Sequence, residues 1–148
     1  MPVNPMSSAR MDNFLAELAK NDVKGFHRTR SVYRMNDKEV SIRTTTKPGP
    51  VYWYDISKSI MNGVDYFIYQ TNSSSHFVLF PSAFFKDCYS KLQDSNRPNA
   101  KQFYIDWTHK TLVSKNPRFS QNIASYCCST QPSENAGTWR SVFLSALS

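Results

Sequence analysis

The sequence predicts an α+β fold in a single domain, with a mixed central sheet of about five to six strands and flanking helices. The chain has 148 residues, the size of one ordinary domain, and 40% of them are hydrophobic, which is enough to form a core. Segments with helical periodicity alternate with segments of strand-like periodicity. Their order is one helix, several strands, a second helix, another strand and then further helices, which is typical of a mixed sheet with helices around it.

The N-terminal half contains one predicted helix followed by strands. An apolar stripe of Met11, Phe14, Leu15 and Leu18 predicts a helix over 8–20. Aromatic and β-branched residues alternate with arginine over 25–35, which indicates a strand that ends at a turn of Asn, Asp and Lys. Two further strands are expected over 39–45 and 51–57, separated by a Lys-Pro-Gly-Pro loop at 47–50.

The middle of the chain contains the most apolar segments. Continuous apolar runs over 66–69 and 77–80 predict strands that are covered on both faces, in the middle of the sheet. Turn residues at 72–75 indicate that these two strands pair antiparallel. A helix is expected to begin at Pro81, because proline suits the first helical turn and an apolar stripe follows it.

The C-terminal third has a weaker pattern. Alternating apolar residues predict a strand over 102–107. The segment from 112 to 132 has no clear period, and a short helix is expected near 120–125. A final amphipathic helix is predicted from Gly137 to Leu147.

Composition and motifs exclude several classes of protein. Only four glycines are present, and neither GxGxxG nor GxxxxGK[ST] occurs, which excludes a Rossmann or P-loop nucleotide enzyme. No apolar run is long enough to span a membrane, and the polar N-terminus lacks the apolar core of a secretory signal. The three cysteines, Cys88, Cys127 and Cys128, predict free thiols in a reducing cytoplasm. The chain stops directly after an amphipathic run, so we expect one module of a longer protein.

Positive charge is concentrated in two segments. The net charge is +7 and the pI is about 9.4, which favours a polyanionic partner. Residues 24–58 hold eight basic residues against three acidic ones, and residues 86–118 hold seven against three. In a regular strand, Arg28, Arg30 and Arg34 would share one face, each about 7 Å from its nearest same-face neighbour, which is close to the spacing of successive phosphates. The alternative is a solvated edge strand, on which basic residues oppose aggregation.

Aromatic residues lie next to this positive charge. Trp53 and Tyr54 follow the 47–50 loop, and Trp107 precedes His109 and Lys110. Most aromatic rings belong to the core, because they bury large apolar surfaces. One or two rings beside a basic stripe could instead stack an unpaired base.

No catalytic constellation is evident. GxSxG is absent, and the three histidines lack the spacing of zinc ligands. We therefore expect no catalytic residue, no metal ligand and no cofactor. The enzymatic alternative is a metal-dependent nuclease, which would use carboxylates among Asp37, Glu39, Asp55 and Asp65.

Four segments carry a family resemblance: Lys38–Thr45, Tyr52–Ile56, Val64–Tyr69 and Phe77–Pro81. In this order they resemble the strand series of restriction-endonuclease-like proteins with the PD-(D/E)xK core. There, a strand with (D/E)xK precedes an aromatic-rich strand, a strand with aspartate and apolar residues, and a strand that ends in proline. The composition is also similar to the DNA-recognition modules of bacterial restriction enzymes, which carry basic loops and aromatic pockets and include readers of modified bases.

The sequence departs from the family pattern at the (D/E)xK position. The chain has either Glu39-Val40-Ser41 or Ser41-Ile42-Arg43 there, so the lysine is missing in both registers. Asp37 is too close to this strand to be the preceding metal-binding aspartate. The resemblance therefore implies a degenerate site.

We expect a DNA-recognition module of a bacterial restriction or defence protein over residues 1–148, binding duplex DNA, plain or modified. An RNA-binding or protein-interaction module is the other alternative to the nuclease, and no membrane partner is expected. The residues expected to contact DNA are Arg28, Arg30, Arg34, Arg43, Lys47, Trp53, Tyr54, Trp107, His109 and Lys110.

Overall fold

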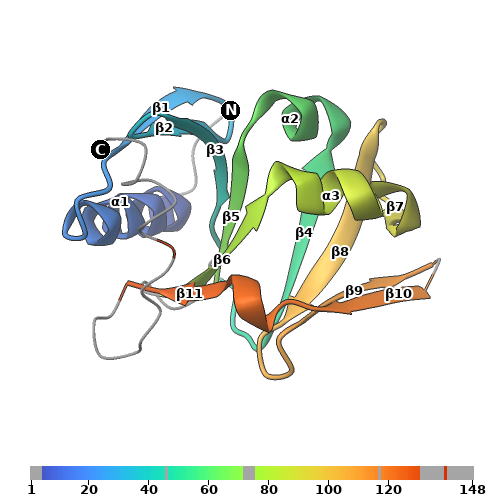
Figure 1. Ribbon diagram of the computed structural model, residues 1–148. Coiled ribbons are helices and arrows are strands. Elements are labelled where there is room, and N and C mark those ends of the chain that lie inside the picture. The colour runs from blue at the N-terminus through green and yellow to red at the C-terminus, as the bar shows by residue number, and fades with distance from the viewer. Residues whose placement is uncertain (1–4, 46, 72–75, 117, 131–138, 140–148) are drawn as a thin grey trace.

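Two β-sheets and three α-helices form the described part of the chain, which comprises residues 5–45, 47–71, 76–116, 118–130 and 139 of a computed structural model (Figure 1). The α+β class predicted from the sequence is confirmed. The first sheet is mixed, as predicted, but the strands expected over 51–57 and 102–107 belong to a second sheet that was not predicted.

The first sheet is mixed, and its strand order is β1-β2-β3-β5-β6-β11. Neighbouring strands are antiparallel except β3 and β5, which pair in parallel with Val40 opposite Tyr66. The central strands β5 and β6 are buried on both faces, as their continuous apolar sequences predicted. The strands are β1 Gly25–Thr29, β2 Val32–Met35, β3 Lys38–Arg43, β5 Tyr66–Gln70, β6 His76–Pro81 and β11 Cys127–Ser129.

The second sheet is antiparallel, with the order β10-β9-β8-β4 and with β7 paired to β8. In β4 and β8 the alternate residues Tyr54 and Phe103 are buried, while their neighbours Trp53 and Tyr104 point to the other face. The strands are β4 Val51–Ser57, β7 Gln93–Asp94, β8 Ala100–Asp106, β9 Thr111–Lys115 and β10 Arg118–Asn122.

The helices cover two separate cores. Helix α1 packs one face of the first sheet, where the rings of Phe14 and Phe77 meet edge to face at 5.3 Å. The other face packs against the second sheet, with buried residues of α2 and α3 in the same cluster. The first sheet is therefore the middle layer of the molecule. The helices are α1 Pro5–Ala19, α2 Lys58–Gly63 and α3 Ser82–Cys88, with 3₁₀ turns η1 Tyr89–Lys91 and η2 Ala124–Tyr126.

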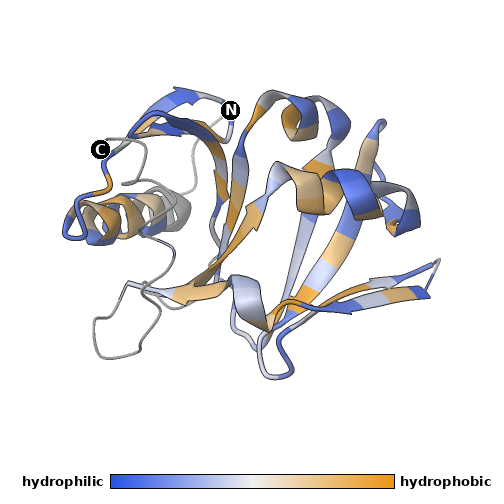
Figure 2. Cartoon of the chain, viewed as in Figure 1, coloured by the Kyte–Doolittle hydropathy of each residue, from blue (hydrophilic) through white to orange (hydrophobic). Residues whose placement is uncertain are grey.

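The segment over 25–35 is a hairpin and not the single strand that was predicted. The chain reverses at Arg30 and Ser31, and Arg30 has a φ of 50°, in the left-handed region. The ring nitrogen Nε2 of His27 lies 2.8 Å from the Arg30 carbonyl oxygen and braces this turn. The arginines at 28, 30 and 34 consequently do not form a regular row on one strand face. Figure 2 shows that hydrophilic residues follow this hairpin, whereas apolar residues follow β6.

Other segments also differ from the sequence predictions. The region near 120–125 forms strand β10 and the 3₁₀ turn η2 instead of an α-helix, and α2 is a further helix that was not predicted. Helix α3 stops at Cys88, earlier than its apolar stripe suggested, and continues as η1. The predicted turn at 72–75 lies outside the described residues. So does the predicted final helix, apart from the helical residue Trp139.

Candidate functional site: a basic cavity between the sheets

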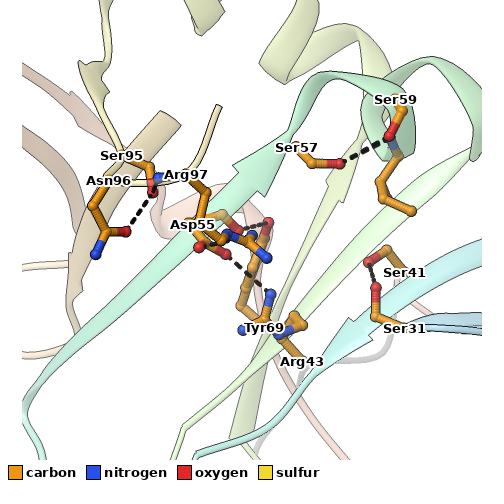
Figure 3. A network of polar contacts seen from close by, with 11 residues as sticks. Ser31, Ser41, Arg43, Asp55, Ser57, Ser59, Tyr69, Ser95, Asn96 and Arg97 are labelled. Atoms are coloured by element: carbon orange, nitrogen blue, oxygen red, sulfur yellow. Dashed lines mark hydrogen bonds and ion pairs between the residues drawn. The ribbon is translucent and has the colours of Figure 1, made fainter. Parts of the chain in front are cut away.

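A cavity of about 580 Å³ opens where β4 of the second sheet lies beside β3 and β5 of the first. Its lining combines apolar and polar residues, and Figure 3 shows the polar side chains of this region. Three arginines, four serines and one carboxylate contribute the polar lining: Arg30, Arg43, Arg97, Ser31, Ser41, Ser57, Ser59 and Asp55. The cavity thus combines cationic and hydroxyl donors with apolar residues.

Asp55 forms ion pairs with two arginines, and its pair with Arg43 joins the two sheets. Its Oδ1 accepts a hydrogen bond from Arg43 Nη1 at 3.1 Å, and its Oδ2 lies 2.8 Å from Arg97 Nη2. Arg43 ends β3, Asp55 lies on β4, and Arg97 lies in the connection between β7 and β8. Each guanidinium has five N–H donors, so its contact with Asp55 leaves further donors for a ligand. Both arginine side chains are about half exposed, at 42% and 56%.

The serine hydroxyls form two pairs in the lining of the cavity. The Oγ atoms of Ser31 and Ser41 lie 2.9 Å apart, and Ser41 is buried in β3. Ser57 is the N-cap of α2, because its Oγ accepts a hydrogen bond from the Ile60 N–H at 3.1 Å. The Oγ of Ser59 lies 3.3 Å from that of Ser57. Each hydroxyl can donate or accept, so the serines can follow the demands of an anionic ligand.

Tyr69 forms part of the lining and is held by an aromatic cluster. Its ring meets Phe103 edge to face at 5.3 Å and Tyr54 at 4.7 Å. Burial raises the pKa of the Tyr69 hydroxyl well above its ordinary value, and the charge of Arg43 only partly opposes this. Tyr69 therefore stays neutral, and its hydroxyl points to the Asp55 carbonyl oxygen at 3.5 Å. Tyr69 therefore contributes a neutral, buried ring to the lining of the cavity.

The predicted basic residues are only partly brought together. Arg30 and Arg43 line the cavity. Arg34 forms an exposed ion pair with Glu39 at 3.3 Å, and Arg28 lies at an irregularity of the β1–β2 pairing. Lys47 is exposed in the loop before β4.

The predicted aromatic residues lie in three different environments. Tyr54 is buried, and its hydroxyl donates a hydrogen bond to the Gln70 carbonyl oxygen, so its ring is core and the prediction that it meets a base is wrong. Trp53 is 44% exposed on the outer face of the second sheet. Trp107 already contacts the Lys110 ammonium, 3.6 Å from its ring centroid, and the stacked ring of His76 at 5.4 Å.

Trp107, His109 and Lys110 lie at the opposite end of β4 from the cavity. The backbone N–H of Trp107 donates a hydrogen bond to the carbonyl oxygen of Pro50, next to Val51 at the start of β4. The cavity is lined by Asp55 and Ser57, at the end of this strand. Strand β4 has seven residues, and the distance from Val51 to Ser57 along it corresponds to about 20 Å. These three residues and the cavity arginines therefore do not form one continuous site.

His109 contacts the carboxylate of Asp106 through its ring and its backbone. Its Nδ1 lies 2.8 Å from Asp106 Oδ2, and its backbone N–H donates to Oδ1 at 3.2 Å. Desolvation pushes the pKa of Asp106 upward, but the hydrogen bonds from His109 outweigh it, so the pKa of Asp106 is lowered. His109 is thus engaged within its own turn.

Arg97 is the principal cavity residue that the sequence analysis did not select. It lies between Asn96 and Pro98, in a segment that only predicts a chain reversal. No periodicity links it to Arg43, which is 54 positions earlier in the chain. The one sequence signal that could have identified Arg97 was its place in the basic segment 86–118.

The carboxylates of the nuclease alternative are dispersed. Asp65 Oδ2 accepts a hydrogen bond from the Glu39 N–H at 3.0 Å, and the Glu39 carboxylate pairs with Arg34. Asp55 lies in the cavity between two arginines, and Asp37 lies in the β2–β3 turn. Among the described residues, no group of three His, Cys, Asp or Glu side chains is arranged to hold a metal ion.

The three cysteines are not activated thiols. They are unpaired, and burial raises the pKa of Cys88 and Cys127 to about 11 and that of Cys128 to about 12. A nucleophilic cysteine needs a lowered pKa, so these side chains serve packing.

No protein-family model, curated protein or solved structure matches the chain. Within the part of the chain that the structure describes, none of the helices has the length and apolar character needed to cross a membrane.

Proposed function

We propose that the chain is a DNA-recognition module that holds the phosphate backbone of duplex DNA at the arginine cavity without cutting it. The observation that carries this proposal is the lining of the cavity. Arg30, Arg43 and Arg97 supply three positive charges, and Asp55 is the single carboxylate in the lining. The site therefore keeps an excess of positive charge after its internal ion pairs are formed.

Phosphate is the anion that suits these donors best. Guanidinium groups hold phosphate oxygens through paired N–H donors, and serine hydroxyls are frequent additional phosphate contacts. The net charge of +7 supplies the long-range attraction that a nucleic acid backbone requires. Phosphate contacts position DNA but do not read its sequence, so recognition of bases must come from other residues.

The family resemblance supports binding without cleavage. The expected order of a (D/E)xK strand, an aromatic strand, an aspartate strand and a strand ending in proline corresponds to β3, β4, β5 and β6. In the register Ser41-Ile42-Arg43, both Ser41 and Arg43 line the cavity, so a hydroxyl stands where the family has a metal-binding carboxylate. We place the module in a bacterial restriction or defence protein of the cytoplasm, where free thiols are stable.

The test compares two double variants of equal charge in a titration of labelled duplex DNA. Arg43→Gln with Arg97→Gln removes two cavity cations, and Lys24→Gln with Lys86→Gln removes two exposed lysines from other surfaces. We expect the cavity variant to lose about 1.5–3 kcal/mol of binding free energy per arginine, the value of a charge-assisted hydrogen bond. The slope of log K against log salt should become shallower by about 0.9 per lost phosphate contact.

The lysine variant should bind within a few-fold of the parent chain, because its charges act only at long range. Equal losses in the two variants would show a non-specific effect of net charge and contradict the cavity assignment. Parallel titrations with duplexes that carry modified bases show whether base modification changes affinity.

A further inference from the structure

Most of the outer face of the second sheet lies outside the cavity, which shares only Asp55 and Ser57 of β4 with it. Buried side chains of β4, β8 and β9 point to the core, so Trp53, Tyr104 and Val113 form a row across the opposite face. Every outward side chain of β4, β8, β9 and β10 is exposed or half-exposed. This surface, which we call the Trp53 face, comprises Val51, Trp53, Tyr104, Val113, Lys115 and Arg118.

The Trp53 face presents apolar and aromatic surface to solvent. Phe26, Val51 and Trp53 are the exposed large hydrophobic residues of the described chain, and two of the three lie on this face. The Trp53 and Tyr104 rings lie 4.9 Å apart with an angle of 52° between their planes. The exposed face of such a ring pair can stack with a further planar group.

The charge of this face is positive. Lys115 Nζ lies 5.3 Å from the Trp53 ring centroid and 5.9 Å from that of Tyr104. Arg118, opposite Lys115 on β10, is exposed. The two carboxylates that border the face are engaged elsewhere, Asp55 with its arginines and Asp106 with His109.

Aromatic rings flanked by cations match a single-stranded nucleic acid and not a duplex. Unpaired bases expose their π-faces for stacking, whereas a duplex covers them with neighbouring base pairs. The adjacent phosphates supply the negative charge that lysine and arginine need. A sheet face with exposed aromatics is also a common platform for single strands in unrelated folds.

We propose that the Trp53 face binds a single-stranded nucleic acid segment. An unpaired base stacks on Trp53 and Tyr104, and Lys115 and Arg118 contact the flanking phosphates. This inference extends the proposed DNA-binding function to a second surface, and it depends on other residues than the cavity arginines, so each can fail without the other.

The experiment titrates the full chain with a labelled dT oligonucleotide of about 12 nucleotides, a length within the usual site size. Trp53→Ala should weaken binding between about five-fold and a hundred-fold, the usual range for loss of one stacked base. Tryptophan fluorescence should be quenched on binding, and this quenching should disappear in Trp53→Phe. The matched control is Phe26→Ala, which removes an exposed ring from β1 of the other sheet.

The outcomes separate the two proposals. Arg43→Gln with Arg97→Gln should weaken duplex binding and leave dT binding unchanged, and Trp53→Ala should do the reverse. Thermal midpoints confirm that each variant is folded. Absence of dT and rU binding, or equal effects of Trp53→Ala and Phe26→Ala, would overturn the inference. Binding of rU with the same dependence on Trp53 would support stacking and identify RNA as the source of the strand.

Discussion

Asp55 determines how much positive charge the cavity offers to a ligand. It occupies one donor of Arg43 and one of Arg97, and it is the single carboxylate in the lining. An incoming phosphate must share the two guanidiniums with this carboxylate. Asp55 therefore holds the arginines in position and also competes with the anion that they are proposed to bind.

Asp55→Asn should strengthen duplex binding by roughly five-fold at low salt. The physical reason is the repulsion between two charges about 4 Å apart, which is about 1 kcal/mol in water. The variant should lose at most about 1 kcal/mol of stability, because both ion pairs are partly exposed. Binding titrations and urea unfolding measure the two effects.

The control for this variant is Asp94→Asn. It removes the same charge from an exposed ion pair with Lys101 that also measures 2.8 Å. It should leave binding nearly unchanged. Weaker binding by Asp55→Asn would show that positioning of the arginines matters more than competition, and the prediction would then be wrong.

At the scale of secondary structure, α2 is a short helix that connects the cavity to the core. It follows β4 directly, begins at the Ser57 cap and buries Met61 between the sheets. A helix of six residues is too short to be stable alone, so its cap and its packing decide whether it forms. The lining of the cavity at Ser57 and Ser59 therefore depends on this one helical turn.

Ser57→Ala should destabilise the chain by about 1 kcal/mol, because it removes the hydroxyl that accepts the Ile60 N–H. Ser59→Ala is the matched control, since the Ser59 hydroxyl lines the same cavity but does not cap the helix. Urea unfolding measures both variants. An equal loss of stability in the two would show that the cap contributes nothing beyond a contact in the cavity lining.

Sequence periodicity predicted the elements that bury apolar side chains and missed those that do not. Strand β4 has the predicted bounds of 51–57, because Tyr52, Tyr54 and Ile56 alternate with exposed residues. The β9–β10 hairpin was missed because most residues of β10 are exposed and impose no apolar period. The turn at Arg30 was missed because no glycine, asparagine or proline marks it.

The same reasoning explains what could be predicted of the candidate site. Arg43 was selected because local charge and strand alternation identify it. Its partner Arg97 is brought close only by the pairing of β4 with β8, a long-range event that no local pattern encodes. Tyr54 was predicted to meet a base, although alternation puts it on the opposite face of the strand from Trp53, and that face is buried.

At the scale of the whole molecule, the excess positive charge should dominate the affinity for DNA. With four to six phosphate contacts, the affinity should fall by roughly two to three decades between 50 and 200 mM salt. Binding should not require Mg²⁺, because the proposed contacts are guanidinium and hydroxyl groups. Fluorescence anisotropy at several salt concentrations, with and without EDTA, measures both properties.

The proposed DNA-binding function also predicts that excess protein leaves supercoiled plasmid intact in Mg²⁺ or Mn²⁺. Agarose gels provide the measurement. Nicking that disappears in Glu39→Ala or Asp55→Ala would replace the binding function with a nuclease. Affinity that does not change with salt would contradict the electrostatic part of the proposal.

The path of the chain between β3 and β5 has a consequence for how the protein folds. After β3 the chain leaves the first sheet, forms β4 in the second sheet and α2, and returns to pair β5 with β3. The parallel β3–β5 pair therefore closes a long segment of chain that includes β4, a strand of the other sheet. Closing this segment is entropically unfavourable until the two sheets pack against each other. Neither sheet is a separate folding unit, so the two are expected to assemble and to melt in one cooperative step.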